Sequence, residues 1–358
     1  MEPVKEYAHL KEEELLGRIH RAKEELGDSL IILGHHYQRD EVIQFADFRG
    51  DSLELSRRAA EQKKARHIVV CGVRFMAETA AVVCGKEQVV LTPNLKAGCP
   101  LADFAQLDDV KQAWEELQEA DVGSLVPVAY VNSAAVVKAF CAQNGGISCT
   151  SANAKVIVGW GLKRGKVFFM PDENLGMNAA RECGLSQDKV VLWEPGKTLG
   201  GNEIEELRRA EMIVWRGHCY VHSSFAFADV ERVRVKDPKA KVIVHPECPP
   251  AVVEAADGSA STSQILRIVE EAPPGTSFAV GTEVNMVERL NSEYPDKEVF
   301  PLKRSICEDM AKIDPPGLLH ILESLVAGTP VNVVHLSPEV RKWGALAISR
   351  MLHIKARR

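Results

Sequence analysis

Three stretches of this 358-residue chain repeat one order of features, and they end at Cys99, Cys219 and Cys307. In the first stretch an apolar run leads into His35, and further apolar runs follow Ser52. The last stretch has the same order from His245 through Thr262. The intervals agree, because His35 precedes Ser52 by 17 residues and His245 precedes Thr262 by 17 residues. A repeated unit predicts a repeated structure whose equivalent loops meet at one centre, so we expect one site with three walls.

The middle stretch has the same order with longer connections. Its apolar runs cover 127–130, 167–170 and 213–215, and a Thr-Ser pair lies at 150–151. Strand-like runs alternate with helix-like segments throughout the chain, which favours parallel sheets with helices on both faces. We therefore predict an α/β protein with three similar three-layer αβα units. Their expected ranges are 1–100, completed by 309–358, then 101–219 and 220–308.

The charge and hydropathy of the chain exclude some classes of partner. A formal net charge of −6 at pH 7 gives no basis for binding nucleic acid or an anionic membrane surface, because both require clustered Lys and Arg. No apolar run approaches the roughly 20 residues of a transmembrane helix. The first residues also lack the apolar core of a secretory signal. We therefore expect a cytoplasmic protein that binds neither nucleic acid nor membranes.

The nine cysteines are not expected to form structural disulfides, because the cytoplasm keeps thiols reduced. No Cys-x-x-Cys pair occurs, which excludes zinc ribbons and thioredoxin-like sites. Four cysteines lie within strand-like or helix-like segments and are predicted to be small core residues: Cys71, Cys84, Cys141 and Cys183. The cysteines that close the three repeats differ, because each follows a strand and a short turn, where a side chain is presented to a site.

Three thiolates from separate loops indicate a metal site, but their spacing does not identify the metal. Zinc usually takes four ligands, or three and a water, and His218 and His222 could complete such a set. An iron–sulfur cluster normally takes four cysteines, so a cluster held by three leaves one iron open. An open iron acts as a Lewis acid on hydroxyl or carboxylate oxygens, which suits the removal of water. Zinc and a cluster both stay open at this point.

Polar side chains follow the strand-like runs at the place where ligands bind in open α/β sheets, outside the carboxyl ends of the strands. They are His35, His36, Tyr37, Tyr130, Asn132, His245 and Glu247. Ser52, Ser151 and Thr262 recur downstream at expected helix starts, where each is suited to cap the helix. Helix N-termini attract anions, so three such ends facing one cavity predict a substrate with several carboxylates or a phosphate.

Nine short motifs, in order along most of the chain, resemble the quinolinate synthase family. The first five are Gly-His-His-Tyr-Gln (34–38), Ala-Asp-Phe-x-Gly-Asp-Ser (46–52), Val-x-Phe-Met-Ala-Glu-Thr (73–79), Tyr-Val-Asn (130–132) and Thr-Ser-Ala-Asn-Ala (150–154). The other four are Pro-Asp-Glu-Asn-Leu-Gly (171–176), Gly-His-Cys-Tyr-Val-His (217–222), Val-His-Pro-Glu-Cys (244–248) and Gly-Thr-Glu (281–283). Each motif alone is a weak signal, whereas nine in the same order are a strong one.

The resemblance implies a pseudo-threefold arrangement of the αβα units around a central active-site cavity, in agreement with the repeat. It also implies a 4Fe-4S cluster held at the motif positions Cys99, Cys219 and Cys307. The implied reaction condenses iminosuccinate (iminoaspartate) with dihydroxyacetone phosphate to give quinolinate, phosphate and water in the de novo biosynthesis of NAD. The cluster would serve as a Lewis acid in the dehydration. L-aspartate oxidase or aspartate dehydrogenase would supply iminosuccinate, and a homodimer is a further expectation.

The resemblance also implies which residues form the site. The family's dicarboxylate-binding pattern carries over to His35, Ser52, Tyr130, Val131, Asn132, Ser151, His245, Pro246, Glu247 and Thr262. We assign general acid–base work to Glu247 and Tyr37, with His35 and His222 assisting through hydrogen bonds. Glu247 is the leading candidate, because a carboxylate beside His245 and the cluster could move protons as the ring forms. His36 receives no catalytic role.

Two hypotheses from other classes stay open. An aconitase-like hydratase would use the same open iron on a different hydroxy acid. A non-catalytic zinc or iron–sulfur protein, such as a sensor, would use the three cysteines alone. We favour the synthase, because a sensor has no need for three sets of anion-binding groups.

Overall fold

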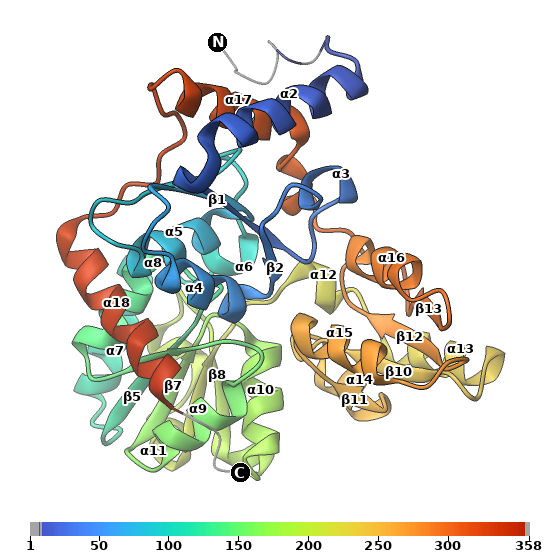
Figure 1. Cartoon of the computed structure of the whole chain (residues 1–358). Coiled ribbons are helices and arrows are strands. Elements are labelled where there is room, and N and C mark those ends of the chain that lie inside the picture. Colours follow the sequence, from blue (N-terminus) through green and yellow to red (C-terminus); the bar gives the residue numbers. More distant parts are fainter. Residues whose placement is uncertain (1–6, 8, 355–358) are drawn as a thin grey trace.

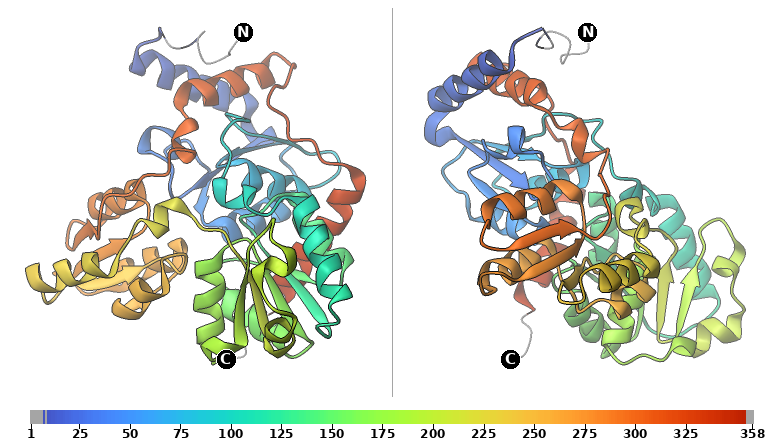
Figure 2. Two further views of the ribbon diagram at one scale, coloured as in Figure 1. Left: turned by 180° about the vertical axis from the view of Figure 1, so that it is seen from behind. Right: turned by 90° about the vertical axis from the view of Figure 1, so that its right-hand side faces the viewer.

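A computed structural model describes residue 7 and residues 9–354, and it contains three parallel sheets with helices around them (Figure 1). The sheets have four, five and four strands. Figure 2 shows that the sheets and their helices form three lobes around a common centre. The α/β class and the three similar units predicted from the repeat are confirmed. None of the described helices combines the length and the apolarity that crossing a membrane requires.

The first sheet has the strand order β2-β1-β3-β4. Its strands are β1 (Leu30–His35), β2 (Phe48–Gly50), β3 (His67–Cys71) and β4 (Val89–Leu91). The helices of this part of the chain are α2 (Glu12–Leu26), α3 (Asp40–Ile43), α4 (Ser52–Glu61), α5 (Arg74–Val83) and α6 (Pro100–Asp103). All six residues of β1 are buried, because helices cover both faces of the sheet, as is usual for parallel sheets.

The third sheet repeats this order as β11-β10-β12-β13. Its strands are β10 (Lys241–Val244), β11 (Gly258–Ser259), β12 (Ser277–Gly281) and β13 (Glu298–Pro301). The helices here are α13 (Phe227–Lys236), α14 (Pro250–Ala255), α15 (Thr262–Glu271) and α16 (Val284–Glu293), followed by the 3-10 turn η4 (Met310–Lys312). The first and third sheets are therefore two copies of one topology, in which the first strand lies between the second and the third.

The middle sheet has a fifth strand, in the order β6-β5-β7-β9-β8. Its strands are β5 (Leu125–Tyr130), β6 (Ile147–Cys149), β7 (Lys166–Met170), β8 (Val190–Trp193) and β9 (Met212–Trp215). Its helices are α7 (Leu107–Glu119), α8 (Ala135–Gln143), α9 (Ala154–Leu162), α10 (Glu173–Glu182), α11 (Ile204–Arg209) and α12 (Tyr220–Ser223). Strand β9 occupies the position of the fourth strand and β8 pairs outside it. This added edge strand accounts for the longer connections of the middle stretch.

The last two helices return to earlier parts of the chain. Helix α17 (Pro315–Val326) packs on α2, and the two helices share a core with the first sheet. The apolar stripe of α2 at Leu15, Ile19 and Ala22 has the spacing of one helix face. Helix α18 (Pro338–His353) packs on α8, β6 and α5, so it links the first and middle sheets (Figure 1).

Candidate active site

Each sheet places one polar residue at the point where its strand order reverses. That point is the carboxyl end of the first strand, which lies between the second and third strands. His35 ends β1, Tyr130 ends β5 and His245 follows β10. Ligands of open α/β sheets bind at such switch points. The three residues line one cavity.

The cavity brings together every residue predicted for the site except one. The predicted residues that line it are His35, Tyr37, Ser52, Cys99, Tyr130, Val131, Asn132, Ser151, Cys219, His222, His245, Glu247, Thr262 and Cys307. Pro246 lies behind the cavity wall, where its carbonyl oxygen accepts a hydrogen bond of 2.9 Å from Asn178 Nδ2. The roles assigned to these residues in binding and catalysis stay predictions.

The histidines of the first and third units have the same local geometry. The Nδ1 atom of His35 accepts the Tyr37 N–H at 3.2 Å, and the Nδ1 atom of His245 accepts the Glu247 N–H at 3.3 Å. These hydrogen bonds assign the proton of each neutral ring to Nε2. Burial lowers the pKa of His35 well below its usual range and that of His245 to about 3. The first and third units therefore each offer the cavity a neutral imidazole whose Nε2–H is a hydrogen-bond donor.

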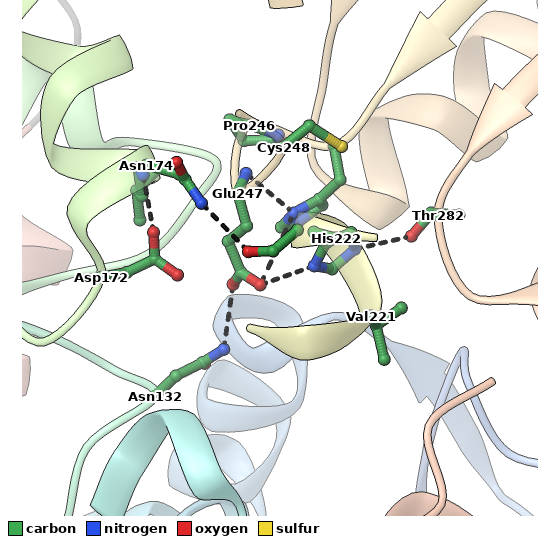
Figure 3. Close-up of polar contacts among 12 residues, drawn as sticks. Asn132, Asp172, Asn174, Val221, His222, Pro246, Glu247, Cys248 and Thr282 are labelled. Atoms are coloured by element: carbon green, nitrogen blue, oxygen red, sulfur yellow. Dashed lines mark hydrogen bonds and ion pairs between the residues drawn. The ribbon is translucent and has the colours of Figure 1, made fainter. Parts of the chain in front are cut away.

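Both carboxylate oxygens of Glu247 are hydrogen-bonded by neighbouring side chains. The Tyr130 hydroxyl and Asn132 Nδ2 donate to Oε1, the latter at 3.1 Å, and His222 Nδ1 lies 2.7 Å from Oε2 (Figure 3). The His222 and His245 rings stack with centroids 4.3 Å apart. Burial acts to raise the pKa of Glu247, but His222, His245 and the hydrogen bonds lower it to about 2. Glu247 is therefore a buried carboxylate that stays ionised.

A chain of hydroxyl and imidazole groups continues from Glu247 to Tyr37. The Tyr37 hydroxyl lies 2.7 Å from the Thr282 hydroxyl and 3.2 Å from His222 Nε2. Thr282 also lies 3.2 Å from His222 Nε2 (Figure 3). Burial, together with the nearby Glu247, raises the pKa of Tyr37 well above its usual range. The chain thus joins a phenol that keeps its proton to a carboxylate that keeps its charge, through His222.

Backbone N–H groups three positions later act on the three repeat cysteines. The Met310 N–H donates to Cys307 Sγ at 3.4 Å. The N–H groups of Ala102 and His222 act to lower the pKa of Cys99 and Cys219, although burial outweighs them. The Cys219 and Cys99 loops also approach each other, because a Cβ on Gly217 would lie 2.8 Å from Phe104. Backbone N–H groups directed at sulfur are typical of iron–sulfur ligands.

The surroundings of these three thiols favour the protonated form when no metal is bound. Burial raises the pKa of all three thiols, and neighbouring thiols raise it further for Cys99 and Cys219. Within the described residues, no Lys or Arg lines the cavity to stabilise a thiolate. A bound metal would favour the thiolate instead of the thiol, since coordination deprotonates a thiol outright. The donor set therefore fits a metal group.

One set of three potential metal-ligand atoms lies close enough together to bind a single metal ion. Of the described residues, only Cys219, His222 and Glu247 form a group of three such ligand atoms within 4.8 Å of one another. Cys99 and Cys307 do not belong to that group. His218, considered as a zinc ligand on spacing, is exposed, packs its ring 5.3 Å from Phe104 and does not line the cavity.

The expectation that Ser52, Ser151 and Thr262 cap helices is wrong. Asp51 caps α4 by accepting the N–H groups of Leu53 and Glu54, and Ser261 caps α15. Ser52 and Thr262 are the first helical residues, and Ser151 lies in a turn three residues before α9. Among the described residues none hydrogen-bonds the three hydroxyls, which line the cavity instead. Each hydroxyl is thus available to a ligand.

Several residues of the site were not assigned roles from the sequence. Thr282 and Asp51 lie in motifs that were identified, Gly-Thr-Glu and Gly-Asp-Ser, but nothing in those motifs separates them from their neighbours. Tyr220 was also missed, and its hydroxyl lies 3.7 Å from Cys307 Sγ and 3.3 Å from Asp309. Its place directly after Cys219 was the one available signal.

Comparison with known proteins adds an independent finding. Residues 17–353 match the family described as Quinolinate synthetase A protein. The chain is 46% identical over 353 residues to the quinolinate synthase of Corynebacterium glutamicum, covering 98% of this chain and 90% of that protein. It is 47% identical over 349 residues to that of a Nocardioides species, covering 94% and 89%. The quinolinate synthase of Rhodopirellula baltica is 42% identical over 370 residues, covering 99% and 94%.

Proposed function

Because the chain belongs to the quinolinate synthetase A family, we propose that it condenses iminosuccinate with dihydroxyacetone phosphate. The products are quinolinate, phosphate and water, in NAD biosynthesis. One observation carries the proposal: three repeat cysteines and the Glu247–His222–Tyr37 chain line the same cavity. A site for removing water and a site for moving protons are therefore adjacent.

We propose that Cys99, Cys219 and Cys307 hold a 4Fe-4S cluster. Sulfur ligands of a single zinc ion lie about 2.3 Å from the metal and hence close together. The three thiols do not form a group within 4.8 Å, which favours a larger metal group. When bound, a cluster on three cysteines supplies an open iron that acts as a Lewis acid on a substrate oxygen. The backbone N–H of Met310, which donates to Cys307 Sγ, supports this assignment.

The neutral donors of the cavity account for the binding of anionic substrates. The proposed substrates carry two carboxylates and a phosphate between them, yet no Lys or Arg lines the described cavity. The Ser52 and Thr262 hydroxyls instead lie at the N-termini of ten-residue helices, where the helix dipole favours negative charge. His35 and His245 add Nε2–H donors. We assign the carboxylates and the phosphate to these groups together.

We assign proton transfer to Glu247 and Tyr37, connected through His222. Glu247 is ionised and lines the cavity, so it can accept a proton from a substrate carbon or nitrogen. His222 Nδ1 then holds the carboxyl group in place at 2.7 Å. The Tyr37 hydroxyl keeps its proton and can donate it to a departing oxygen. Asn132 and Tyr130 orient the carboxylate through Oε1.

The proposed substrate requires a source, because iminosuccinate is an unstable imine. L-aspartate oxidase or aspartate dehydrogenase would supply it by oxidising aspartate. We place the activity in the cytoplasm, in keeping with nine free cysteines, and a homodimer stays a prediction.

The test is anaerobic reconstitution with iron and sulfide, followed by an assay for quinolinate and phosphate. We expect both products only when iminosuccinate and dihydroxyacetone phosphate are present together. Conversion of a hydroxy acid without dihydroxyacetone phosphate would indicate the aconitase-like hydratase. Bound zinc without iron or sulfide in anaerobically purified protein, and no turnover, would indicate the non-catalytic alternative.

A further inference from the structure

One buried carboxyl group beside Glu247 takes no part in the proposed reaction. Asp172 is fully buried and caps α10, where its Oδ1 accepts the Leu175 N–H at 2.7 Å. Its Oδ2 is buried and has no hydrogen-bond partner among the described residues. A buried carboxylate oxygen without a donor is costly and needs an explanation.

The described residues around Oδ2 offer it acceptors and no hydrogen-bond donor. Figure 3 shows the carboxyl group of Asp172 pointing toward the carboxylate of Glu247. The Nδ2 amide of Asn132 donates to Glu247, and its own Oδ1 is a second buried acceptor that has no partner in the described part of the chain. An ionised Asp172 would add a further acceptor and a second negative charge here. A proton on Asp172 removes both problems, since it turns one acceptor into a donor.

The repeat offers an internal comparison. The residue that precedes the helix after the third strand is Val73 in the first unit, Asp172 in the middle unit and Glu283 in the third. Glu283 is also a buried cap, but Asn285 donates to both of its oxygens and the Cys307 N–H adds a bond at 3.4 Å. The Glu283 carboxyl is therefore satisfied locally. Asp172 differs because its second oxygen is turned to the catalytic centre.

We propose that Asp172 is a neutral carboxylic acid whose Oδ2–H donates a hydrogen bond to the Glu247 carboxylate and holds it for proton transfer. Asp172 does not line the cavity, so it is a positioning residue that acts through Glu247. The inference rests on the proposed role of Glu247 as the base.

The charges around Asp172 support its neutral state. Burial raises its pKa well above the usual range, and Glu247 and Glu173 raise it further, against the backbone N–H groups of Leu175 and Asn174. The other titratable groups that face it are Tyr130, Cys149 and Cys248, whose pKa values are also raised. The adjacent Glu173 lies 3.9 Å from Arg216, whose side chain is half-exposed.

Two substitutions separate this role from helix capping. Asp172→Asn is neutral, keeps an oxygen for the cap and keeps a donor for Glu247. Asp172→Ser keeps the cap, since Ser caps helices as well as Asp does, but its side chain ends before Glu247. Glu173→Gln is the matched control, because it changes the adjacent carboxyl group and leaves Asp172 intact. All variants are reconstituted anaerobically, and their thermal unfolding is compared with that of the parent protein.

The decisive measurement is the infrared difference spectrum between the parent protein and Asp172→Asn near neutral pH. We expect a carbonyl stretching band of a protonated carboxylic acid that Asp172→Asn removes and Glu173→Gln retains. We also expect kcat to fall about tenfold or more in Asp172→Ser, the usual loss for a hydrogen bond to a charged group. Asp172→Asn should restore most of that loss and keep the pH profile of the parent.

Two results would overturn the proposal. A difference spectrum that loses carboxylate bands instead of the protonated band would show that Asp172 is ionised. Equal loss of kcat in Asp172→Asn and Asp172→Ser would show that the donor to Glu247 has no effect. If the parent protein makes no quinolinate, the proposed function fails, but the infrared band still decides the protonation state of Asp172.

Discussion

Asp51 and Ser261 cap two helices from different units and also hydrogen-bond each other, with Ser261 Oγ donating to Asp51 Oδ2 at 3.2 Å. The next residue of each helix, Ser52 or Thr262, lines the cavity. Ser263 strengthens the junction, because its hydroxyl lies 2.6 Å from Glu54 and accepts the Asp51 N–H at 3.3 Å. The distance between two substrate-facing hydroxyls thus depends on this group of hydrogen bonds between the first and third units.

Asp51→Ala should weaken both the fold and substrate binding. It removes the cap of α4, which costs about 1 kcal/mol, and a hydrogen bond to a charged group, which costs roughly 1.5–3 kcal/mol. We expect a lower unfolding midpoint in urea and a KM raised by about tenfold, with a smaller change in kcat. Asp51→Asn is the control, since Asn also caps helices and its amide reaches Ser261. Loss of kcat at unchanged KM in Asp51→Ala would contradict the positioning role.

Glu247→Gln should abolish most turnover with little loss of structure. Gln has the shape of Glu, so Tyr130 and Asn132 can still donate to its oxygen, but it cannot accept a proton. Loss of a general base typically costs about 10²–10⁴ in rate, and we expect kcat to fall in this range. Glu254→Gln is the control, because Glu254 is exposed and pairs with Arg181. A Glu247→Gln protein with kcat within a few-fold of the parent would remove Glu247 from the reaction.

The three-unit fold was predictable because the central strands are buried on both faces and read as unbroken apolar runs. Strands β1 and β10 are of this kind. The short edge strands β2 and β11 have the sequences Phe-Arg-Gly and Gly-Ser and carry no apolar pattern. They are strands only because they pair with β1 and β10. A sequence pattern reports burial, so it misses strands that are defined by pairing at an exposed edge.

The sequence was enough to predict which loops form the candidate site. It was not always enough to predict which residue of a loop faces the cavity. Asp51-Ser52 and Ser261-Thr262 each place two good capping residues in succession. A shift of one residue turns a side chain by about 100° around the helix, so the choice decides which hydroxyl faces the cavity. The role of Thr282 in the site depends on its hydrogen bond to Tyr37, which lies 245 positions earlier in the sequence. No local pattern contains that information.

Single Cys→Ser substitutions should divide the cysteines into two classes. At Cys99, Cys219 or Cys307 the substitution removes a proposed metal ligand. Loss of a residue that only hydrogen-bonds a ligand already lowers metal affinity by about 10–100-fold, so loss of the ligand itself should cost more. We expect these variants to lose most bound iron, acid-labile sulfide and visible absorption after anaerobic reconstitution, and with them quinolinate formation. Cys71→Ser and Cys183→Ser should keep the bound iron and sulfide and also the formation of quinolinate. A Cys219→Ser protein with a full complement of iron would refute the assignment of that ligand.

His36 should make the fold sensitive to mild acid. Burial, with Arg289 and Arg49, lowers the pKa of His36 to about 4, although Asp51 acts against this. The unfolded chain takes up the proton near pH 6.5 and the native protein only near pH 4, so stability is complete above pH 6.5 and falls as the pH drops toward 4. The slope is up to about 1.4 kcal/mol per pH unit for one histidine. His35 and His245 shift in the same direction.

The measurement is urea unfolding of the parent protein and His36→Asn at several pH values between 7 and 5. We expect His36→Asn to lose less stability over this range, by up to about 1.4 kcal/mol for each pH unit below 6.5. His353→Asn is the control, because His353 is exposed near the end of α18 and should leave the slope unchanged. Parallel curves for the parent and His36→Asn would mean that burial of His36 does not couple folding to pH. In that case the acid sensitivity would be assigned to His35 and His245, two of the three histidines that line the cavity.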